Sequence, residues 1–369
     1  MIFNLDMDLL TLVRKPVQKI SVIQWGKTNY DNSYIILKWG ENPYYPPKSI
    51  INAIKRSLNA INRYPILMNK LKNKLSVYTG CNVSQICLTN GLDKAFRLIA
   101  EVFIDRDDEV ITFTPSYPVF DESINMMAGK VIKVPLDKNF KIPTIKLLNK
   151  YVTKDTKIIY ICNPNNPTGN FIATNQEIEQ LLKLNLIIVV DEAYFEFSGR
   201  TAISLLKKYE NLIILRSFSK TFGLAGLRVA YMLSSPKIID YITRIEDSLE
   251  VFNTSTPSLT GAIASIENYQ AIKNNIEKIN NTKRLLVEKL NEINILTYPS
   301  FTSFIMFNLK RIGIKTKDFI KRTEQEKIIL KDVSIYSGLS EYDVYMAIPR
   351  DDQLEKVVNS INKVIKNLS

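Results

Sequence analysis

The stretch LIIVVDEAY, residues 186–194, runs from five consecutive apolar side chains directly into two acids. A strand that is buried on both faces reads as such a continuous apolar run. Asp191 would then lie at the carboxyl end of the strand, where ligands bind in open α/β sheets. The stretch therefore predicts a buried parallel strand that carries a carboxylate to a binding site, although an aspartate after a strand can equally cap a helix.

Similar apolar runs alternate with helical patterns between residues 84 and 234. Such alternation indicates a mainly parallel sheet covered by helices, and thus the α/β class. After Pro236 the pattern becomes a long helical stretch and then a mixed α+β tail. We expect a large domain at residues 48–250 and a smaller lobe at 251–369, which an N-terminal arm at 1–47 joins. The expected strands are 86–89, 110–113, 131–134, 157–162, 186–190, 212–215 and 229–233.

Residues 217–228, SFSKTFGLAGLR, place a lysine between hydroxyls and an arginine eight residues after it. A lysine amine forms a Schiff base with an aldehyde only when it is unprotonated, which burial and a neighbouring cation favour. Ser217, Ser219 and Arg228 can donate hydrogen bonds to a dianionic phosphate. The segment therefore suits an anchored, phosphorylated aldehyde, pyridoxal 5'-phosphate (PLP), bonded to Lys220. The alternative is a solvated lysine in a serine-rich turn.

Residues 157–169, KIIYICNPNNPTG, form a second apolar run that enters a turn fixed by prolines and a glycine. Asn166 in this turn can donate a hydrogen bond to the phenolic oxygen of PLP and stabilise its anionic form. The carboxylate of Asp191 can keep the pyridine nitrogen protonated, so that the ring withdraws electrons. A purely structural turn would explain the asparagines and prolines equally well.

The three segments together resemble the fold-type I PLP enzymes of aminotransferase class I/II. Within that group the chain is most similar to the histidinol-phosphate aminotransferases and the related threonine-phosphate decarboxylases. The resemblance begins at residues 40–44, GENPY, continues through 63–65 and 89–93, and reaches 298–300 and the final helix. It therefore covers nearly the whole chain, and it implies the fold of aspartate aminotransferase, a PLP-dependent transferase with a large and a small domain.

The resemblance implies a role for each matching residue around the cofactor. Lys220 would be the Schiff-base lysine and proton shuttle, and Asn166 with Tyr194 would bind the phenolic oxygen. Tyr117 would stack on the ring, because it follows a strand-like run and presents an aromatic face at its end; a core tyrosine is the alternative. Asp191 would bind the pyridine nitrogen. The phosphate would be held by a helix start at Gly91, Leu92 and Asp93, where the family usually has Ser or Ala in place of Leu92, and by Ser217, Ser219 and Arg228.

Further implied roles concern a second subunit and the substrate. Tyr64 resembles a tyrosine that reaches the phosphate of the cofactor from the neighbouring subunit, which implies a homodimer with shared sites. Asn42 and Tyr44, in the GENPY segment, are expected to contact the substrate. The partners implied are thus a second copy of the chain, a small phosphorylated metabolite and an amino-acid donor.

The chain departs from the family where the substrate binds. The family has an arginine in a C-terminal strand that grips the α-carboxylate of an amino acid, and Tyr345 occupies its place. Arg350 could substitute after a local shift in the alignment. Lys331 stands where the family often has an arginine that contacts the phosphate of the substrate, although a surface lysine at a strand end is the alternative.

Two enzyme functions fit these residues. In the favoured one, PLP takes an amino group from a donor such as glutamate and passes it to a small phosphorylated ketone or aldehyde. The acceptor would be imidazoleacetol phosphate or a three-carbon ketose phosphate, and the product a phosphorylated amino alcohol. In the alternative, the enzyme decarboxylates an amino acid O-phosphate of the threonine- or serine-phosphate type. A non-enzymatic scaffold is disfavoured, because all the cofactor motifs are present.

Composition excludes several other functions. The 369 residues include no histidine, which rules out His-based triads and His-ligated metals. Cys81, Cys87 and Cys162 are not spaced as metal ligands or a disulfide framework, so we expect a reducing cytoplasm and no metal. No export leader and no membrane span are expected. The net charge of +12 is dispersed along the chain, which predicts attraction of anionic metabolites and no nucleic-acid partner.

Overall fold

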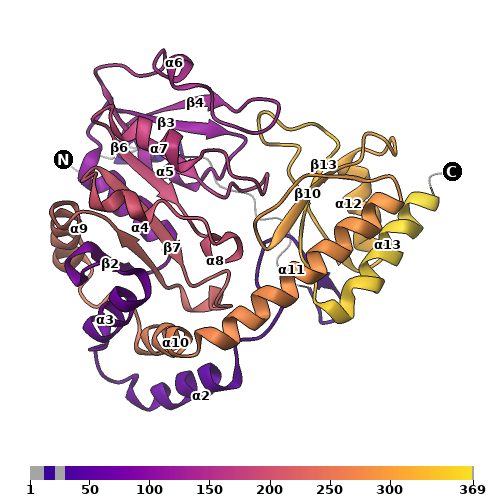
Figure 1. Cartoon of the computed structure of the whole chain (residues 1–369), viewed down its shortest axis with the longest axis horizontal. Helices are drawn as coiled ribbons and strands as arrows, with labels where there is room; N and C mark the ends of the chain where they lie inside the picture. The colour runs from indigo at the N-terminus through magenta and orange to yellow at the C-terminus, as the bar shows by residue number, and fades with distance from the viewer. Residues whose placement is uncertain (1–11, 21–29, 368–369) are drawn as a thin grey trace, which may run out of the picture.

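The computed structural model describes residues 12–20 and 30–367. These residues form two lobes: a larger one on the left of Figure 1, around a seven-stranded sheet, and a smaller one on the right, around a four-stranded sheet. The predicted arm at 1–47 lies partly outside the described residues. The domain boundaries at 48 and 250 stay predictions.

The sheet of the larger lobe confirms the predicted α/β class. Its strand order is β2-β8-β7-β6-β5-β3-β4, and β8 is antiparallel to both of its neighbours while the other pairs are parallel. The strands are β2 (Ile86–Thr89), β3 (Glu109–Thr114), β4 (Lys130–Pro135), β5 (Thr156–Cys162), β6 (Ile187–Asp191), β7 (Leu212–Ser217) and β8 (Ala230–Leu233).

Strand β6 shows why its sequence is apolar throughout. Ile188 and Val190 pack into one hydrophobic cluster, and Val189 packs into the other on the opposite face of the sheet. Both faces are therefore covered, as parallel sheets require. One face is covered by α4 (Leu92–Phe103), α5 (Val119–Met126) and α9 (Pro236–Leu249), and the other by α3 (Met68–Thr79), α7 (Asn175–Leu182) and α10 (Thr256–Glu267).

The smaller lobe is built on the antiparallel sheet β12-β13-β10-β9. Helix α11 (Tyr269–Glu292) leads from the larger lobe into it (Figure 1). An early segment of the chain reaches the same lobe, because β1 (Ile35–Ile36) pairs in parallel with β11 (Ile328–Ile329). The other elements of this lobe are β9 (Leu296–Thr297), β10 (Phe304–Asn308), α12 (Thr316–Gln325), β12 (Lys331–Asp332), β13 (Asp343–Ala347), η6 (Asp351–Gln353) and α13 (Leu354–Lys366).

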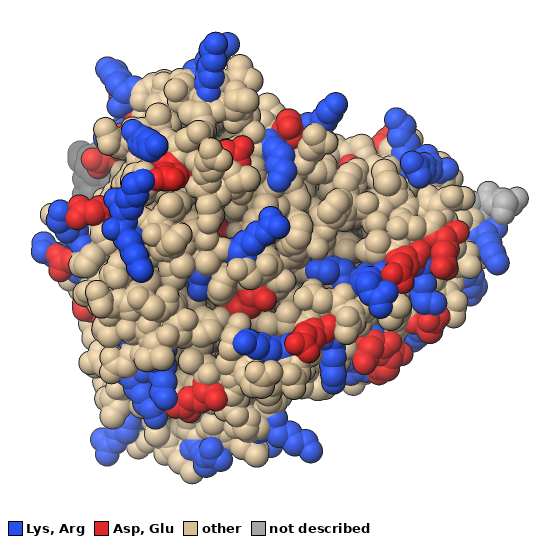
Figure 2. Space-filling view, viewed as in Figure 1, with Lys and Arg blue, Asp and Glu red and all other residues tan. Residues whose placement is uncertain are grey.

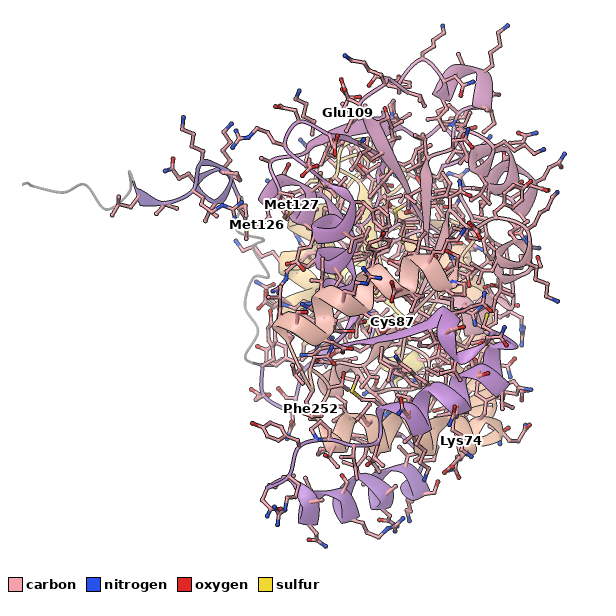
Figure 3. The ribbon with its side chains drawn as sticks, turned by 90° about the vertical axis from the view of Figure 1, so that its left-hand side faces the viewer. Lys74, Cys87, Glu109, Met126, Met127 and Phe252 are labelled. Carbon is pink, nitrogen blue, oxygen red and sulfur yellow. The ribbon has the colours of Figure 1, made fainter. Side chains whose placement is uncertain are left out.

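Short elements complete the described chain. Helix α1 (Lys15–Gln18) lies beside α5, where Arg14 donates a hydrogen bond to the carbonyl of Met126 at 3.4 Å, near the Met126 label of Figure 3. None of the described helices is long and apolar enough to cross a membrane. The remaining elements are α2 (Lys48–Ser57), η2 (Leu58–Ala60), η3 (Val83–Gln85), α6 (Ile145–Leu148), α8 (Phe195–Ser198), η4 (Ile203–Lys207) and η5 (Ala225–Leu227).

The surface charge is dispersed in three dimensions as well. On the face shown in Figure 2, lysine and arginine side chains are scattered over both lobes and alternate with acidic ones. No single basic patch of the kind that follows a nucleic-acid backbone appears on that face.

Candidate functional site

A cavity of about 370 Å³, here called the central chamber, lies between the strand ends of the large sheet and the small lobe. Most of the residues singled out from the sequence meet in it. Its lining includes Leu92, Asp93, Tyr117, Asn166, Asp191, Tyr194, Ser217, Ser219, Lys220, Arg228, Lys331 and Tyr345. It also includes Lys38, Trp39, Glu41, Cys162, Ala193 and Ala225, which sequence analysis did not select.

Asp191 is the last residue of β6, and its side chain lines the chamber. One carboxylate oxygen accepts a hydrogen bond from the hydroxyl of Tyr160 at 2.9 Å, and the other from the backbone N–H of Ala193 at 3.0 Å. Burial raises the pKa of Asp191 to about 6, although both hydrogen bonds oppose the rise. The carboxylate is thus held in one orientation and is mainly ionised at neutral pH, as a partner for a protonated ring nitrogen should be.

Lys220 is the lysine of the chamber that was predicted to bond to PLP. Its Nζ donates a hydrogen bond to the carbonyl of Trp39 at 2.8 Å. Burial lowers the pKa of Lys220 to about 8; Lys331 and Arg228 lower it further, while Glu41 raises it. A neutral amine, which is the nucleophilic form, is therefore accessible near physiological pH.

The chamber also contains a cradle of hydrogen-bond donors at the start of α4. Gly91 precedes the helix with φ +81°, and a Cβ at this position would lie 2.6 Å from Nη2 of Arg228. Arg228 itself has φ +52°, and its Nη2 donates to Asp93 at 3.0 Å. The backbone conformation at 91 therefore favours glycine, and any side chain there would also displace the guanidinium.

This donor set fits the phosphate of PLP. Helix-start amides point at the ligand in anion sites of this kind, and a guanidinium adds paired charged donors. Ser217 and Ser219 line the same chamber, and the Ser219 N–H donates to Ser217 Oγ at 3.0 Å. The chamber thus offers a phosphate cradle, an amine and a buried carboxylate, which are the three fixed points that PLP requires.

The middle of the chamber holds aromatic and amide groups. Tyr194 is buried and packs edge-on against Phe304, with ring centroids 5.3 Å apart. Burial raises the pKa of Tyr194 and of Tyr117, so both hydroxyls remain neutral donors. Asn166 lies in the loop after β5, and its neighbour Asn165 ties that loop to the Tyr117 segment.

Tyr345 lies opposite Lys331 on neighbouring strands of the small lobe. Its ring is 2% exposed and packs on Phe304 at 4.4 Å between centroids. A Cβ at Gly40, where φ is +62°, would lie 2.4 Å from the Tyr345 hydroxyl. The tyrosine therefore fills the space beside Gly40, and the Nζ of Lys331 turns to the hydroxyl of Tyr336 at 3.0 Å.

Five predicted residues do not line the chamber, although one of them, Gly91, directly precedes the lining residue Leu92. Asn42 donates to the carbonyl of Thr221 at 2.9 Å and so braces the loop that carries the amine. Tyr44 accepts a hydrogen bond from the N–H of Asp351 at 3.3 Å. Arg350 donates twice to Asp352, at 3.0 and 2.8 Å. Tyr64 is 76% exposed on the outer surface and stacks on Phe252 with centroids 4.9 Å apart.

Some residues of the chamber were not predictable from the sequence, and others carried a signal that could have identified them. Tyr160 could have been found, because it is a polar tip in a buried strand on the face opposite its neighbours Ile159 and Ile161. Lys38 and Trp39 gave no such signal. They reach the chamber only because the segment after β1 joins the small lobe, and that packing is not local.

Known proteins that are similar to this chain belong to the family that the sequence predicted. The family model for aminotransferase class I and II matches residues 32–361. A histidinol-phosphate aminotransferase of Methanosphaera stadtmanae is 31% identical over 342 residues, which are 91% of this chain and 92% of the relative. These matches confirm the family predicted from the sequence.

Solved structures share the fold. A histidinol-phosphate aminotransferase from Sinorhizobium meliloti, in complex with pyridoxal-5'-phosphate, has a TM-score of 0.80 at 23% identity and covers 90% of this chain and 91% of its own. The L-threonine-O-3-phosphate decarboxylase from Porphyromonas gingivalis has a TM-score of 0.77 at 20% identity, with coverages of 90% and 99%.

Proposed function

The chain belongs to the aminotransferase class I and II family, which makes it a PLP-dependent aminotransferase, and from that premise we propose its reaction. It moves an amino group between an amino-acid donor, glutamate by expectation, and a small phosphorylated ketone or aldehyde. The product is a phosphorylated amino alcohol, of the histidinol-phosphate type or derived from a three-carbon ketose phosphate. One observation supports this choice: Lys331 lies directly opposite Tyr345 on neighbouring strands of the small lobe.

The residues of the central chamber divide the chemistry among them. PLP, when bound, supplies an aldehyde that bonds to amines and a ring that withdraws electrons. Lys220 holds the cofactor between turnovers and then moves the proton to and from the substrate carbon, for which a pKa of about 8 suits it. With PLP bound, Asp191 would keep the ring nitrogen protonated, and Tyr194 and Asn166 would donate hydrogen bonds to the phenolic oxygen.

The substrate end favours a phosphate over an α-carboxylate. A neutral phenol at 345 cannot make the two parallel hydrogen bonds that a guanidinium makes with a carboxylate. Lys331 still supplies a cation, and an ammonium binds phosphate as a point charge. A phosphorylated acceptor that lacks a carboxylate therefore uses what this end provides and does not need the missing arginine.

The second candidate is a decarboxylase of an amino acid O-phosphate. The loop between β12 and β13 favours it, because Tyr336, Gly338 and Leu339 resemble the decarboxylase branch. This loop crosses to the large lobe, where Ser337 accepts a hydrogen bond from Thr114 at 2.7 Å.

Product analysis separates the two. The PLP form of the enzyme is incubated with candidate phosphorylated amines and amino acids, and its conversion to the amine form is followed by absorbance. Amine transfer to an added keto phosphate supports the aminotransferase. Release of one carbon dioxide for each amino acid O-phosphate consumed would contradict the aminotransferase and support the decarboxylase.

A homodimer with shared sites belongs to the same proposal. Tyr64 lies in an exposed apolar surface with Leu58, Ile61, Ile66 and Phe252, whose side chains are 43–87% exposed. Figure 3 shows Phe252 on one side of the larger lobe. An apolar surface of this kind on a soluble chain favours association. A second copy packed there would bring Tyr64 to the cofactor phosphate of its partner.

Mixed dimers test this arrangement. Lys220→Ala and Tyr64→Phe proteins are inactive or weakened alone, but one of the two sites in a heterodimer would contain neither change. Regained activity on mixing is the expected result. A protein that sediments as a monomer at micromolar concentration would contradict the shared site.

A further inference from the structure

A second cavity adjoins the central chamber. This interlobe groove has a volume of about 800 Å³ and is lined from both lobes. Lys331 is among the residues that line both cavities, so it lies where the two meet. Tyr336 lines the groove and bonds to Lys331, yet its hydroxyl has no part in the function proposed above.

The hydrogen bond between Lys331 and Tyr336 has a fixed direction. An ammonium has three donors and no acceptor, so Nζ of Lys331 donates at 3.0 Å and the phenol oxygen accepts. The phenol proton must point elsewhere, and it meets no acceptor within residues 12–20 and 30–367. The ammonium also polarises the phenol and makes its O–H a stronger donor. The pair therefore presents ammonium N–H groups and a phenol O–H side by side.

The loop that carries Tyr336 is fixed against the large lobe. The hydroxyl of Thr114 donates to the carbonyl of Ser337 at 2.7 Å. Gly338 has φ +92°, and a Cβ there would lie 2.9 Å from Cδ of Pro115. Because the two residues after Tyr336 are held in this way, the phenol is in position before a ligand arrives. Donors that are already in position cost less to order on binding.

A phosphate monoester suits this pair of donors. Its dianion has three terminal oxygens that accept hydrogen bonds, so the ammonium and the phenol can each bind a different one. The nearby carboxylate of Asp332 is turned to Ser334, whose N–H and hydroxyl donate to it at 2.9 and 2.6 Å. Burial raises the pKa of Tyr345, and Tyr336 raises it further, so the Tyr336 phenol lies within electrostatic range of the chamber.

We propose that Tyr336 is a further substrate-binding residue, whose hydroxyl proton binds the phosphate of the substrate together with the Lys331 ammonium. This inference rests on the proposed function, which supplies the phosphorylated substrate. It places the phosphate where the chamber meets the groove and the reacting carbon toward Lys220. The second candidate reaction also uses a phosphorylated substrate, so the role of Tyr336 is the same in both.

The variant Tyr336→Phe removes the hydroxyl and keeps the ring. Calorimetry measures the binding of inorganic phosphate to the PLP-loaded enzyme, in which the cofactor keeps the probe out of the cradle at α4. The loss of one hydrogen bond to a charged group should weaken phosphate binding about tenfold to a hundredfold. The preference in kcat/KM for a phosphorylated amino alcohol over the same alcohol without phosphate should fall by the same factor. Glutamate binding should stay unchanged.

Tyr298→Phe is the matched control. Tyr298 is another tyrosine of the small lobe, its hydroxyl donates to Asp343 at 3.1 Å, and it lines neither cavity. Phosphate binding and the kcat/KM preference should be the same in this variant as in the unchanged enzyme. An equal loss in both variants would overturn the role of Tyr336, because it would then follow from any lost phenol in this lobe.

A double variant distinguishes a ligand from a support for Lys331. If Tyr336 binds the phosphate itself, Tyr336→Phe should lower the kcat/KM preference further in the Lys331→Met enzyme. No further loss there, or weaker glutamate binding in place of weaker phosphate binding, would overturn the inference and leave the proposed function standing. An unchanged enzyme that neither binds phosphate nor prefers phosphorylated amines would remove both.

Discussion

The two ends of the central chamber are assembled differently. At the cofactor end, the functional groups come from the ends of adjacent parallel strands, β5 to β7, and from the start of α4. At the substrate end, they come from the segment after β1 and from the strands of the small lobe, which lie almost 300 residues further along the chain. Cofactor chemistry is therefore encoded in short local segments, while substrate choice depends on how distant segments pack.

The largest effect should come from Lys220→Ala. This variant removes both the amine that bonds to PLP and the group that moves the proton, so turnover should fall by at least about a thousandfold. The visible absorbance of the bound cofactor should disappear as well. Borohydride reduction of the wild-type enzyme, followed by peptide mapping, should place the pyridoxyl group on Lys220.

Lys283→Ala is the control for this variant. Burial lowers the pKa of Lys283 to about 8 as well, but its Nζ donates to the carbonyl of Thr302 and the residue lies outside the chamber. It should retain the cofactor absorbance and most of the turnover. A pyridoxyl group found on any lysine other than Lys220 would show that the cofactor end has been assigned wrongly.

Adjacent acids offer the next contrast. Asp191 faces the chamber, and Asp191→Ala should cost about a hundredfold or more in kcat, because each tenfold loss corresponds to about 1.4 kcal/mol of lost transition-state stabilisation. The thermal midpoint should change little by comparison. Stopped-flow measurement of the half-reaction checks the rate, and a variant with normal kcat would contradict the role of Asp191 at the ring.

Glu192 faces away from the chamber and binds Arg216 at 3.0 Å, with both side chains 2% exposed. Breaking a buried pair leaves an uncompensated charge, so Glu192→Gln should lower the free energy of unfolding by about 3 kcal/mol. At temperatures where the variant is folded, kcat should be nearly unchanged. Denaturant unfolding and steady-state kinetics measure the two quantities, and a large loss of kcat with normal stability would break the contrast.

The difference between local segments and long-range packing also decides which features could be predicted from the sequence. The apolar run of β6 and its terminal Asp191 were predictable, because burial on both faces leaves a local pattern. Arg228 was placed at the phosphate from its spacing to Lys220 and Gly91 through the resemblance, and the Arg228 guanidinium does lie beside Gly91 at the start of α4. The orientation of Arg350 was not predictable, since its two bonds to Asp352 arise in a turn whose geometry no periodicity encodes. The position of Lys38 in the chamber lining depends on the pairing of β1 with β11, which is likewise long-range.

A smaller effect is expected from Tyr345→Arg, which would make the substrate end resemble that of the family. A guanidinium here would be buried beside Lys331, so the thermal midpoint without ligand should fall. Glutamate should bind about tenfold to a hundredfold more tightly, as one charge-assisted pair is worth roughly 1.5–3 kcal/mol. Equilibrium titration checks this, with Tyr345→Phe as the control. If Arg350→Ala abolished amino-acid binding in the otherwise unchanged enzyme, the carboxylate clamp would lie at Arg350.

The smallest expected effect links the two ends of the chamber through charge. PLP added to cofactor-free enzyme can bond only to the neutral amine of Lys220, so the rate at which visible absorbance appears should rise with pH and reach its midpoint near pH 8. An ordinary lysine would give a midpoint near about 10.4. Between these values the unfolded chain binds the additional proton, so this residue also makes stability increase as the pH rises through that window.

Two variants at the substrate end should move this midpoint in opposite directions. Lys331 lowers the pKa of Lys220, so Lys331→Met should shift the midpoint upward, whereas Glu41 raises that pKa, so Glu41→Gln should shift it downward. Each shift should be less than about one pH unit, because the interactions act across a partly solvated chamber. Rates measured from pH 6 to 10 resolve such shifts. Shifts of the same sign in both variants would mean that the charges at the substrate end do not act directly on the amine.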